Sequence, residues 1–427
     1  MLSFSEDLLQ FIWRHRLLKP GTMVTANGHE VTVLNPGELN RDAGPDFFNA
    51  RIKLGGLVLA GNIEVHIRTS DWLKHRHQED KSYDHIILHV VYTHDGDLPQ
   101  NTGNNVEVLE LKNHIAPETI GMYERLAGAT EKLPCSGQIE RVNDLKFISW
   151  MERMTVERLE EKVRRIESIF AASSGDYVQS FYTLLLRNFG FKVNAGPFEM
   201  LARQLPVSLL FKHAGDLSQL EALLLGMAGM LEGLYGDKYV TTLQNEFEFL
   251  KSKYGLTPLP GNIFKFSKLR PANFPNLRLV QFAALVHGNT RLFTGPHANT
   301  SYQALIEALK VKLTGYWKNH YQADGRMSLR DLAMGNDSAE NIIINTMAPF
   351  LFFYSKKTGK PGYGDAALEL LGACRMEDNA KTRLFAAKKA TLQSAAGSQA
   401  VVNLYDNYCS GRQCLKCGIA AAILQPV

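Results

Sequence analysis

The stretch AGPDFFNARIKLGGLVLAGNIEVHIRTSDWLKHRHQED, residues 43–80, decides the fold of the amino-terminal part of the chain. A Gly-Gly step at 55–56 separates two runs of strand-forming residues, Phe47–Leu54 and Leu57–Ile67. A short glycine step between two such runs predicts a β-hairpin. Polar residues that share one face of this hairpin are therefore expected to lie close together.

Three polar residues of the hairpin are candidates for metal chemistry. Asp46 begins the first strand, and Glu64 and His66 lie two positions apart in the second. Alternate side chains of a strand share a face, so Glu64 and His66 are about 7 Å apart along it. If the register places Asp46 over the same face, two carboxylates and an imidazole converge, a set that suits Mg²⁺ or Mn²⁺ and phosphoryl chemistry. We therefore expect a metal site at Asp46, Glu64 and His66.

Histidines are concentrated around the same hairpin. Nine of the thirteen precede residue 120, and five lie between residues 66 and 89. His75 and His77 follow the second strand and are further catalytic candidates. His85 and His89 flank or enter the apolar run IILHVVY, which is typical of a central strand covered on both faces. The alternative interpretation of the set is a polar network with a structural role.

The first ~120 residues alternate between extended segments and one helix, and most of the remainder has helical periodicity. Ser3 with Glu6 predicts the start of a helix that ends near Leu18. Further extended segments are predicted at His29–Leu34, Ile86–Tyr92 and Val106–Leu111. We expect an α+β protein: a mixed α/β sheet domain at 1–117, a mainly α-helical domain at 118–400 and a Cys-rich segment at 401–427.

The longest helical pattern, WMERMTVERLEEKVRRIESIF, places apolar residues at spacings of three and four. Its polar face predicts the ion pairs Glu160–Arg164 and Glu161–Arg165. Farther along, six polar or aromatic residues near helix starts are candidates for phosphate or base contacts, although a solvated helix end explains each as simply. They are Lys192, Arg203, Arg270, Phe274, Arg278 and Gln281.

The cysteines form a second candidate site. The spacing Cys409-x4-Cys414-x2-Cys417 allows three thiols to surround one metal centre. The same spacing begins the plant-ferredoxin pattern, so Zn²⁺ and an iron–sulfur cluster both fit. The fourth ligand has to come from elsewhere, and Cys135 and Cys374 are the candidates among the thiols.

Composition limits the broad class. A chain of 427 residues is too long for one core, and 45% hydrophobic and 21% charged residues are ordinary for a soluble globular protein. A net charge of +4 permits a nucleic-acid partner without requiring one. Signal-peptide features are not found at the start, and glutamates interrupt the most apolar helix candidate. We therefore expect a cytoplasmic protein with reduced cysteines and no membrane partner.

The order of helix, three-stranded meander, short helix and further strand resembles the core of PD-(D/E)XK nucleases, the restriction-endonuclease-like fold. The resemblance implies that Pro45-Asp46 is the PD step, that Glu64 is the second acid and that His66 stands where the family has lysine. The cysteines resemble those of iron–sulfur nucleases of CRISPR adaptation and bacterial recombination, which combine one upstream cysteine with a carboxyl-terminal trio. Here the trio's spacing differs, and Cys135 and Cys374 follow the core instead of preceding it.

Over nearly its full length the chain resembles DUF2851, a bacterial family found largely in Bacteroidetes, in stretches such as GPDFFNARI, NFGFKVNAGPFEMLARQLP and SQAVVNLYDNYCSGRQCLKCGI. This resemblance implies no particular activity. The residues lead us to expect a divalent-metal-dependent nuclease acting on DNA or RNA. Two alternatives stay open: a non-catalytic nucleic-acid-binding or scaffold protein with a degenerate nuclease fold, and a hydrolase of another substrate with a His/Asp/Glu metal site.

Overall fold

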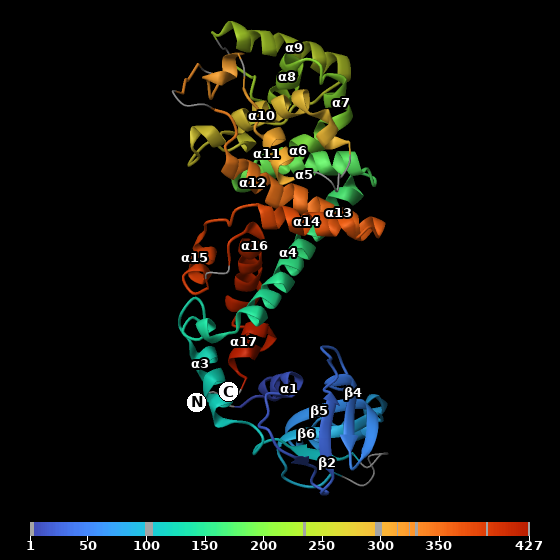
Figure 1. The fold of residues 1–427 in the computed structure, drawn as a ribbon. Coiled ribbons are helices and arrows are strands. Elements are labelled where there is room, and N and C mark those ends of the chain that lie inside the picture. Colours follow the sequence, from blue (N-terminus) through green and yellow to red (C-terminus); the bar gives the residue numbers. More distant parts are fainter. Residues whose placement is uncertain are drawn as a thin grey trace. The chain divides into compact units, whose positions relative to one another are not determined.

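The computed structural model describes residues 4–98, 106–233, 236–294, 301–313, 315–323, 325–328, 332–389 and 392–425. Two compact units are seen in it (Figure 1). The sheet unit comprises Met1–Met151, Arg383–Thr391 and Val402–Val427, and the helical unit comprises Glu152–Thr382 and Leu392–Val401. The predicted class, an amino-terminal mixed α/β sheet followed by a helical region, is confirmed.

A seven-stranded sheet dominates the described part of the sheet unit. Its strands are β1 (Met23–Val24), β2 (Glu30–Asn35), β3 (Glu38–Leu39), β4 (Phe47–Leu54), β5 (Leu57–Arg68), β6 (Ile86–Thr93) and β7 (Val108–Glu110). Their order is β1-β2-β4-β5-β6-β7, with β3 paired to β4. The pairs from β1 to β5 are antiparallel, whereas β5–β6 and β6–β7 are parallel. The predicted extended segments are thus confirmed, with IILHVVY inside the sheet.

Both ends of β4 carry a backbone irregularity. At the β4–β5 turn, Gly55 and Gly56 have φ values of 52° and 95°, which glycine adopts at little cost. At the amino end, the β4–β5 register shifts between Phe47 and Ala50, and Asn49 has φ 55°. This is a β-bulge, which bends a strand and redirects the neighbouring side chains. It lies three residues after Asp46.

The parallel pair β5–β6 depends on a close approach at Gly61. A Cβ there would lie 2.4 Å from Cγ2 of Ile87 and 2.8 Å from the carbonyl oxygen of His85. We expect Gly61→Ala to destabilise the sheet unit by about 1–3 kcal/mol, because one strand has to shift, with urea unfolding as the measurement. Gly128→Ala is the control, since its Cβ would meet nothing within 4 Å. Equal stability of the two variants would contradict this strand pairing.

Helix α1 (Glu6–His15) packs on the sheet through five buried side chains, Leu8, Leu9, Phe11, Ile12 and Trp13. The Ser5 side chain caps it by accepting from the backbone N–H of Leu8, whereas Ser3 lies outside the described residues. The helix ends before Leu18 because Arg16 adopts the left-handed conformation.

The carboxyl-terminal segment belongs to the sheet unit, together with α3 (Pro117–Gly128) and the start of α4 (Asp144–Ala172). The hydroxyl of Thr119 donates to the carbonyl of Leu424 at 3.4 Å, and Lys389 Nζ donates to the carbonyl of Val142 at 2.7 Å. The compact units divide after Met151, whereas the sequence analysis expected 117/118, and the last boundary, 401/402, lies one residue from the expected 400/401. Hydrophobic periodicity marks the helices, but it does not say which core they join.

The helical unit has one large apolar core, to which Leu159, Val163 and Ile166 of α4 contribute. The helices that follow are α5 (Tyr177–Phe189), α6 (Phe191–Gln204), α7 (Val207–Lys212), α8 (Leu217–Met227), α9 (Lys238–Tyr254), α10 (Pro275–Gly288), α11 (Tyr302–Leu309), α12 (Asn336–Ile342), α13 (Ala348–Thr358) and α14 (Gly362–Ala373). A π-helical turn, Ile343–Met347, joins α12 to α13. Three further helices are α15 (Ala380–Ala386), α16 (Ala395–Leu404) and, in the sheet unit, α17 (Gly418–Ile423).

The predicted ion pairs on α4 are wrong. Glu161 pairs instead with Arg158, and Glu160 pairs with Lys356 at 2.8 Å. The choice of partner depends on side chains from other helices, which a single helical pattern does not contain.

Three of the side chains considered for nucleic-acid contacts are used inside the helical unit. Arg278 is buried and donates to Gln281 Oε1 at 2.8 Å, and Gln281 donates to the carbonyl of Leu332 at 2.7 Å. The ring of Phe274 packs against that of Phe266, with centroids 5.3 Å apart. Gln281 thus links α10 to the segment around Leu332, and the Phe274 ring stabilises the loop before α10.

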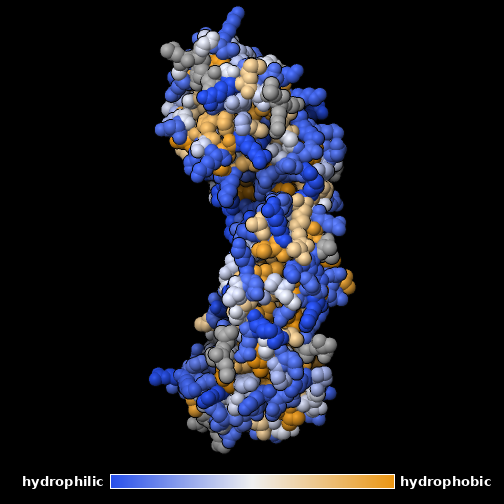
Figure 2. All heavy atoms as spheres, turned by 90° about the vertical axis from the view of Figure 1, so that its left-hand side faces the viewer, coloured by the Kyte–Doolittle hydropathy of each residue, from blue (hydrophilic) through white to orange (hydrophobic). Residues whose placement is uncertain are grey.

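The molecular face shown in Figure 2 is largely hydrophilic, with hydrophobic residues in scattered patches. Within the described ranges, every helix is too short or too polar to cross a bilayer.

Candidate metal centres in the sheet unit

Asp46 and Glu64 meet where the amino end of β4 lies beside β5. The backbone N–H of Asp46 donates to Glu64 Oε2, and that of Val65 donates to Asp46 Oδ2, each at 3.0 Å. The side-chain amide of Gln10, on α1, donates to Asp46 Oδ1 at 3.0 Å. The structure therefore brings the two carboxylates together, which was the condition that the sequence analysis set for a shared site.

Three imidazoles gather on the same side. His66 Nε2, on β5, lies 3.0 Å from His75 Nδ1, 3.3 Å from His77 Nε2 and 3.5 Å from Glu64 Oε1. His77 Nε2 lies 3.2 Å from the same Glu64 oxygen. A ring nitrogen carries either one hydrogen or one lone pair, so a single nitrogen cannot satisfy three such partners through hydrogen bonds. The crowding around His66 Nε2 thus requires another explanation.

A cation between these nitrogens would account for the crowding. Bonds of ~2.0–2.1 Å from one ion to its ligands leave neighbouring ligand atoms about 3.0–3.4 Å apart, the spacing seen between these nitrogens. The nitrogens of His66, His75 and His77 lie within 4.8 Å of one another. The three imidazoles form a candidate metal site, and Glu64 Oε1 lies next to two of them, His66 and His77. Asp46, whose oxygens accept hydrogen bonds, borders this set.

The loop between β5 and β6 positions two of these histidines. His75 caps the carboxyl end of the short helix α2 (Asp71–Lys74), and His77 starts a 3₁₀ turn, His77–Glu79. Between them Arg76 takes a left-handed conformation with φ 58°, which turns the chain back over the sheet. The imidazoles thus come from non-periodic backbone, unlike the two carboxylates.

His89, on β6, contacts the histidine cluster through His66. Its Nε2 lies 2.9 Å from His66 Nδ1 and the side chain is fully buried. If His66 Nε2 coordinates a cation, its Nδ1 carries the hydrogen and donates to His89. Such a partner fixes the orientation of a ligand imidazole. The sequence predicted a histidine in this strand but gave it no role.

The acidic groups of the site are poorly solvated. Burial raises the pKa of Asp46, with the neighbouring charge of Glu64 adding to the effect, and burial also raises the pKa of Glu64. Glu6, at the start of α1, joins them: burial, followed by Asp46, raises its pKa to about 7. Three acids that oppose each other's ionisation are stabilised by a cation. Sequence analysis noted Glu6 only as a capping residue.

Burial favours the neutral form of three of these histidines, His66, His77 and His89. Burial, assisted by His77 and His75, lowers the pKa of His66 to about 3. Burial also lowers the pKa of His77 and brings that of His89 well below its ordinary value. Their lone pairs are therefore available to a metal ion without the loss of a proton.

These pKa shifts predict how metal binding depends on pH. Because the acids rather than the imidazoles lose protons near neutrality, the affinity for Mn²⁺ or Zn²⁺ should rise about tenfold per pH unit per proton released, between about pH 6 and 8. Isothermal titration in buffers of different ionisation enthalpy measures both affinity and proton release. A flat affinity over this window would contradict the assignment of the acids to the site.

Four of the five cysteines form a second cluster. Burial is the main cause of the raised pKa of Cys135 and of Cys409. Neighbouring thiolates add to the effect: Cys417 and Cys414 act on Cys135, and Cys417, Cys135 and Cys414 act on Cys409. None of the described cysteines forms a disulfide. Cys374 lies instead in the helical unit, where Glu340, Glu377 and Arg375 surround its thiol. The structure therefore brings Cys135 to the carboxyl-terminal trio.

The spacing of the four sulfurs bears on the metal. A tetrahedral zinc ion with ~2.3 Å bonds holds its sulfurs about 3.8 Å apart. No three of these described thiols lie within 4.8 Å of one another. An iron–sulfur cluster needs wider spacing, because its thiolates bind different iron atoms. Burial raises the pKa of Cys417 to about 11, and the backbone N–H groups of Ala420 and Ile419, at the start of α17, oppose this rise by donating to its sulfur.

A pocket of about 380 Å³ lies between α1 and the carboxyl-terminal segment. Gln10, which donates to Asp46, forms part of its wall, and Cys414 forms another part. Arg14, Arg412 and Lys416 line it, against one acid, Asp7. The pocket is therefore net positive, and Gln10 links its wall to Asp46.

Comparison with known families gives one result: the family described as "Protein of unknown function (DUF2851)" matches residues 6–380. No curated protein and no solved structure matches the chain.

Proposed function

The chain belongs to the DUF2851 family, and we propose that it is a divalent-metal-dependent phosphodiesterase that cleaves nucleic acid, built on a restriction-endonuclease-like sheet. The observation that carries the proposal is the contact between Asp46 and Glu64 on neighbouring strands, with three imidazoles placed against Glu64. The strand order and the positions of the two acids support the nuclease-like core predicted from the sequence.

Each residue has a distinct role in this proposal. His66, His75, His77 and Glu64 hold the cation, which when bound supplies an activated water and neutralises charge on the phosphoryl oxygens. Asp46, beside this set and with a raised pKa, accepts the proton of the attacking water. His66 occupies the place of the family's lysine, so the cation has to provide the charge that the lysine provides elsewhere.

The ligands favour a first-row transition metal. Mg²⁺ prefers oxygen ligands and a regular octahedron, whereas imidazoles suit Zn²⁺ and related ions. Of the two ions expected from the sequence, Mn²⁺ is therefore the better candidate, and Zn²⁺ joins it. The positive pocket, whose wall Gln10 links to Asp46, suits the phosphates of a DNA or RNA strand that enters the site.

The cysteines support a structural role for an iron–sulfur cluster. Cys135, Cys409, Cys414 and Cys417 would hold it, and it would fasten the carboxyl-terminal segment to the sheet unit. Because Arg412 and Lys416 lie next to these thiols in sequence and line the pocket, the cluster also fixes one wall of the substrate site.

The test is cleavage of labelled DNA and RNA by the purified full chain in Mn²⁺, Zn²⁺, Mg²⁺ or EDTA. We expect cleavage that depends on a transition metal, and a loss of about 10³-fold in Asp46→Ala. Undiminished cleavage by Asp46→Ala would remove the proposal. Salt-dependent binding of nucleic acid without turnover would favour a scaffold protein, and tight zinc with hydrolysis of other substrates would favour a different hydrolase.

A further inference from the structure

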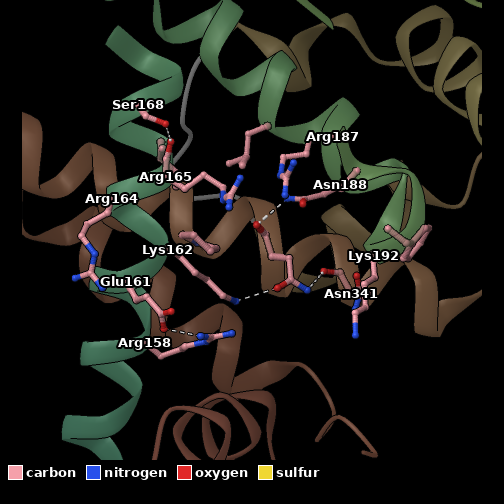
Figure 3. A pocket seen from close by; sticks show the side chains of 16 residues that line it. Arg158, Glu161, Lys162, Arg164, Arg165, Ser168, Arg187, Asn188, Lys192 and Asn341 are labelled. Carbon is pink, nitrogen blue, oxygen red and sulfur yellow. Dashed lines mark hydrogen bonds and ion pairs between the residues drawn. The ribbon is translucent and has the colours of Figure 1, made fainter. Parts of the chain in front are cut away.

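A large basic pocket lies within the helical unit (Figure 3). Its volume is about 1040 Å³, and α4, α5 and α6 provide most of its wall. Six basic side chains and one acid, Glu161, line it. The basic residues are Arg158, Lys162, Arg164, Arg165, Arg187 and Lys192.

Several of these cations have no acidic partner. Arg158 pairs with Glu161, and Arg187 pairs with Glu199 at 2.9 Å. Arg164, Arg165 and Lys192 are exposed and make no ion pair with any residue that the structure describes. The acids predicted to pair with the two arginines bind other residues, so the positive charge of the pocket is left uncompensated.

Two arginines of the pocket lie close together. Figure 3 shows Arg165 extending from α4 toward Arg187 on α5, with Lys192 on the opposite side, whereas Arg164 points away from these residues. The charge of Arg165 contributes, after burial, to a lowered pKa of Arg187, which places the two guanidinium groups near each other. Like charges held together in a concave site are relieved by a bound anion.

Lys162 is built into the floor of the pocket. Its Nζ donates to the carbonyl of Ile344 at 3.1 Å and to Asn345 Oδ1 at 3.0 Å. Burial lowers the pKa of Lys162 to about 7, and a bound anion would stabilise its ammonium form, which has one hydrogen left for that ligand. Asn188 fixes the same turn by donating to the carbonyl of Asn345 at 2.8 Å. The π-helical turn thus holds Lys162 in a defined position.

We propose that this pocket binds the phosphodiester backbone of a nucleic acid, independently of the metal centre in the sheet unit. The cations on α4 extend from Arg158 to Arg165, a span of about 10 Å at ~1.5 Å per residue. A duplex strand presents a phosphate every ~3.4 Å along its axis, so the row matches about three phosphates. A single phosphate would leave most of these cations unpaired.

Readout of bases is not built into the pocket. Phe191 is a lining aromatic residue, and its ring is already covered by the guanidinium of Arg278, 4.5 Å from its centroid. Contacts made through arginine and lysine to phosphates carry no sequence information. Binding is therefore expected to be strong at low salt and insensitive to sequence.

The test is fluorescence anisotropy of a labelled duplex or single strand of about 20 nucleotides with the full chain, in EDTA, over a range of KCl concentrations. EDTA separates binding from cleavage, so failure of the proposed activity leaves this measurement intact. The variant is Arg165→Ala with Lys192→Ala. The matched control is Lys310→Ala with Lys312→Ala, which removes the same charge from exposed positions outside the pocket.

We expect the pocket variant to bind at least about tenfold more weakly near 0.1 M salt, with the slope of log affinity against log salt reduced by about 2. The control should change little, and both variants should unfold like the wild type. Unchanged binding by the pocket variant, or an equal loss in the control, would overturn the proposal. So would displacement of the oligonucleotide by tripolyphosphate at an equal phosphate concentration, which would make the ligand a small polyphosphate.

Discussion

Glu64→Gln is expected to lower the affinity for Mn²⁺ and Zn²⁺ by at least about 100-fold and metal-dependent cleavage by about 10³-fold. Glutamine keeps the shape of the side chain and one oxygen that can accept from the backbone N–H of Asp46. It removes the negative charge, however, and with it the carboxylate oxygen 3.2 Å from His77 Nε2. Metal titration and cleavage assays on the same preparation measure the two losses.

Stability gives a second readout that separates a lost ligand from a lost fold. The folded-state pKa of Glu64 is raised above its unfolded value, so the folded protein holds this proton more tightly than the unfolded chain. Without metal, wild-type stability therefore falls as pH rises from about 5 to 8, and Glu64→Gln should lose less over this range. Urea unfolding in EDTA at the two ends of the range measures the difference.

Glu30→Gln is the matched control, because Glu30 lies on β2 and is exposed. It should bind metal and unfold like the wild type. If Glu64→Gln retained full metal affinity, Glu64 would not be a ligand of the cation. The proposed catalytic centre would then be wrong.

The positions of Glu64 and His66 could be predicted from the sequence because they follow strand periodicity. A Gly-Gly turn fixes the β4–β5 hairpin, and alternation then places Glu64 and His66 on one face. For these two residues, local pattern and tertiary structure agree. The contact of Asp46 with Glu64 also depends on the bulge between Phe47 and Ala50, which shifts the register and which regular alternation does not predict.

The proposed metal ligands could not be ranked from the sequence in the same way. His75 and His77 come from a short helix and a 3₁₀ turn, whose path depends on the left-handed Arg76 and on packing of Trp72 against His77 and His89. No periodicity encodes such a loop. The sequence therefore placed Asp46 among the ligands and left these two histidines as secondary candidates.

Contacts between residues that are far apart in the sequence could not be predicted either. The spacing of the trio of cysteines predicted a metal or cluster site but could not choose between Cys135 and Cys374, since that choice depends on which unit each joins. The same reason explains the wrong ion pairs on α4. Glu160 pairs with Lys356, which lies almost 200 residues away in the sequence, and helical periodicity cannot identify such a partner.

Cys135→Ser should lose the bound iron and the broad visible absorption of a cluster, and should destabilise the sheet unit by at least about 2 kcal/mol. Cys135 lies between α3 and α4, whereas Cys409, Cys414 and Cys417 belong to the carboxyl-terminal segment. Loss of the shared cluster removes a cross-link between these parts of the chain. Iron and sulfide analysis after anaerobic purification, with unfolding followed by circular dichroism, provides the measurements.

Cys374→Ser is the control that makes this result specific. It removes a buried thiol as well, but one surrounded by Glu340, Glu377 and Arg375 of the helical unit, so iron content and colour should be unchanged. Loss of iron in both variants would show that the colour reports general misfolding. Colourless protein with one tightly bound zinc, lost only in Cys135→Ser, would keep the four thiols as ligands but overturn the iron–sulfur assignment. The four sulfurs would then have to move to the shorter spacing found around a single tetrahedral ion.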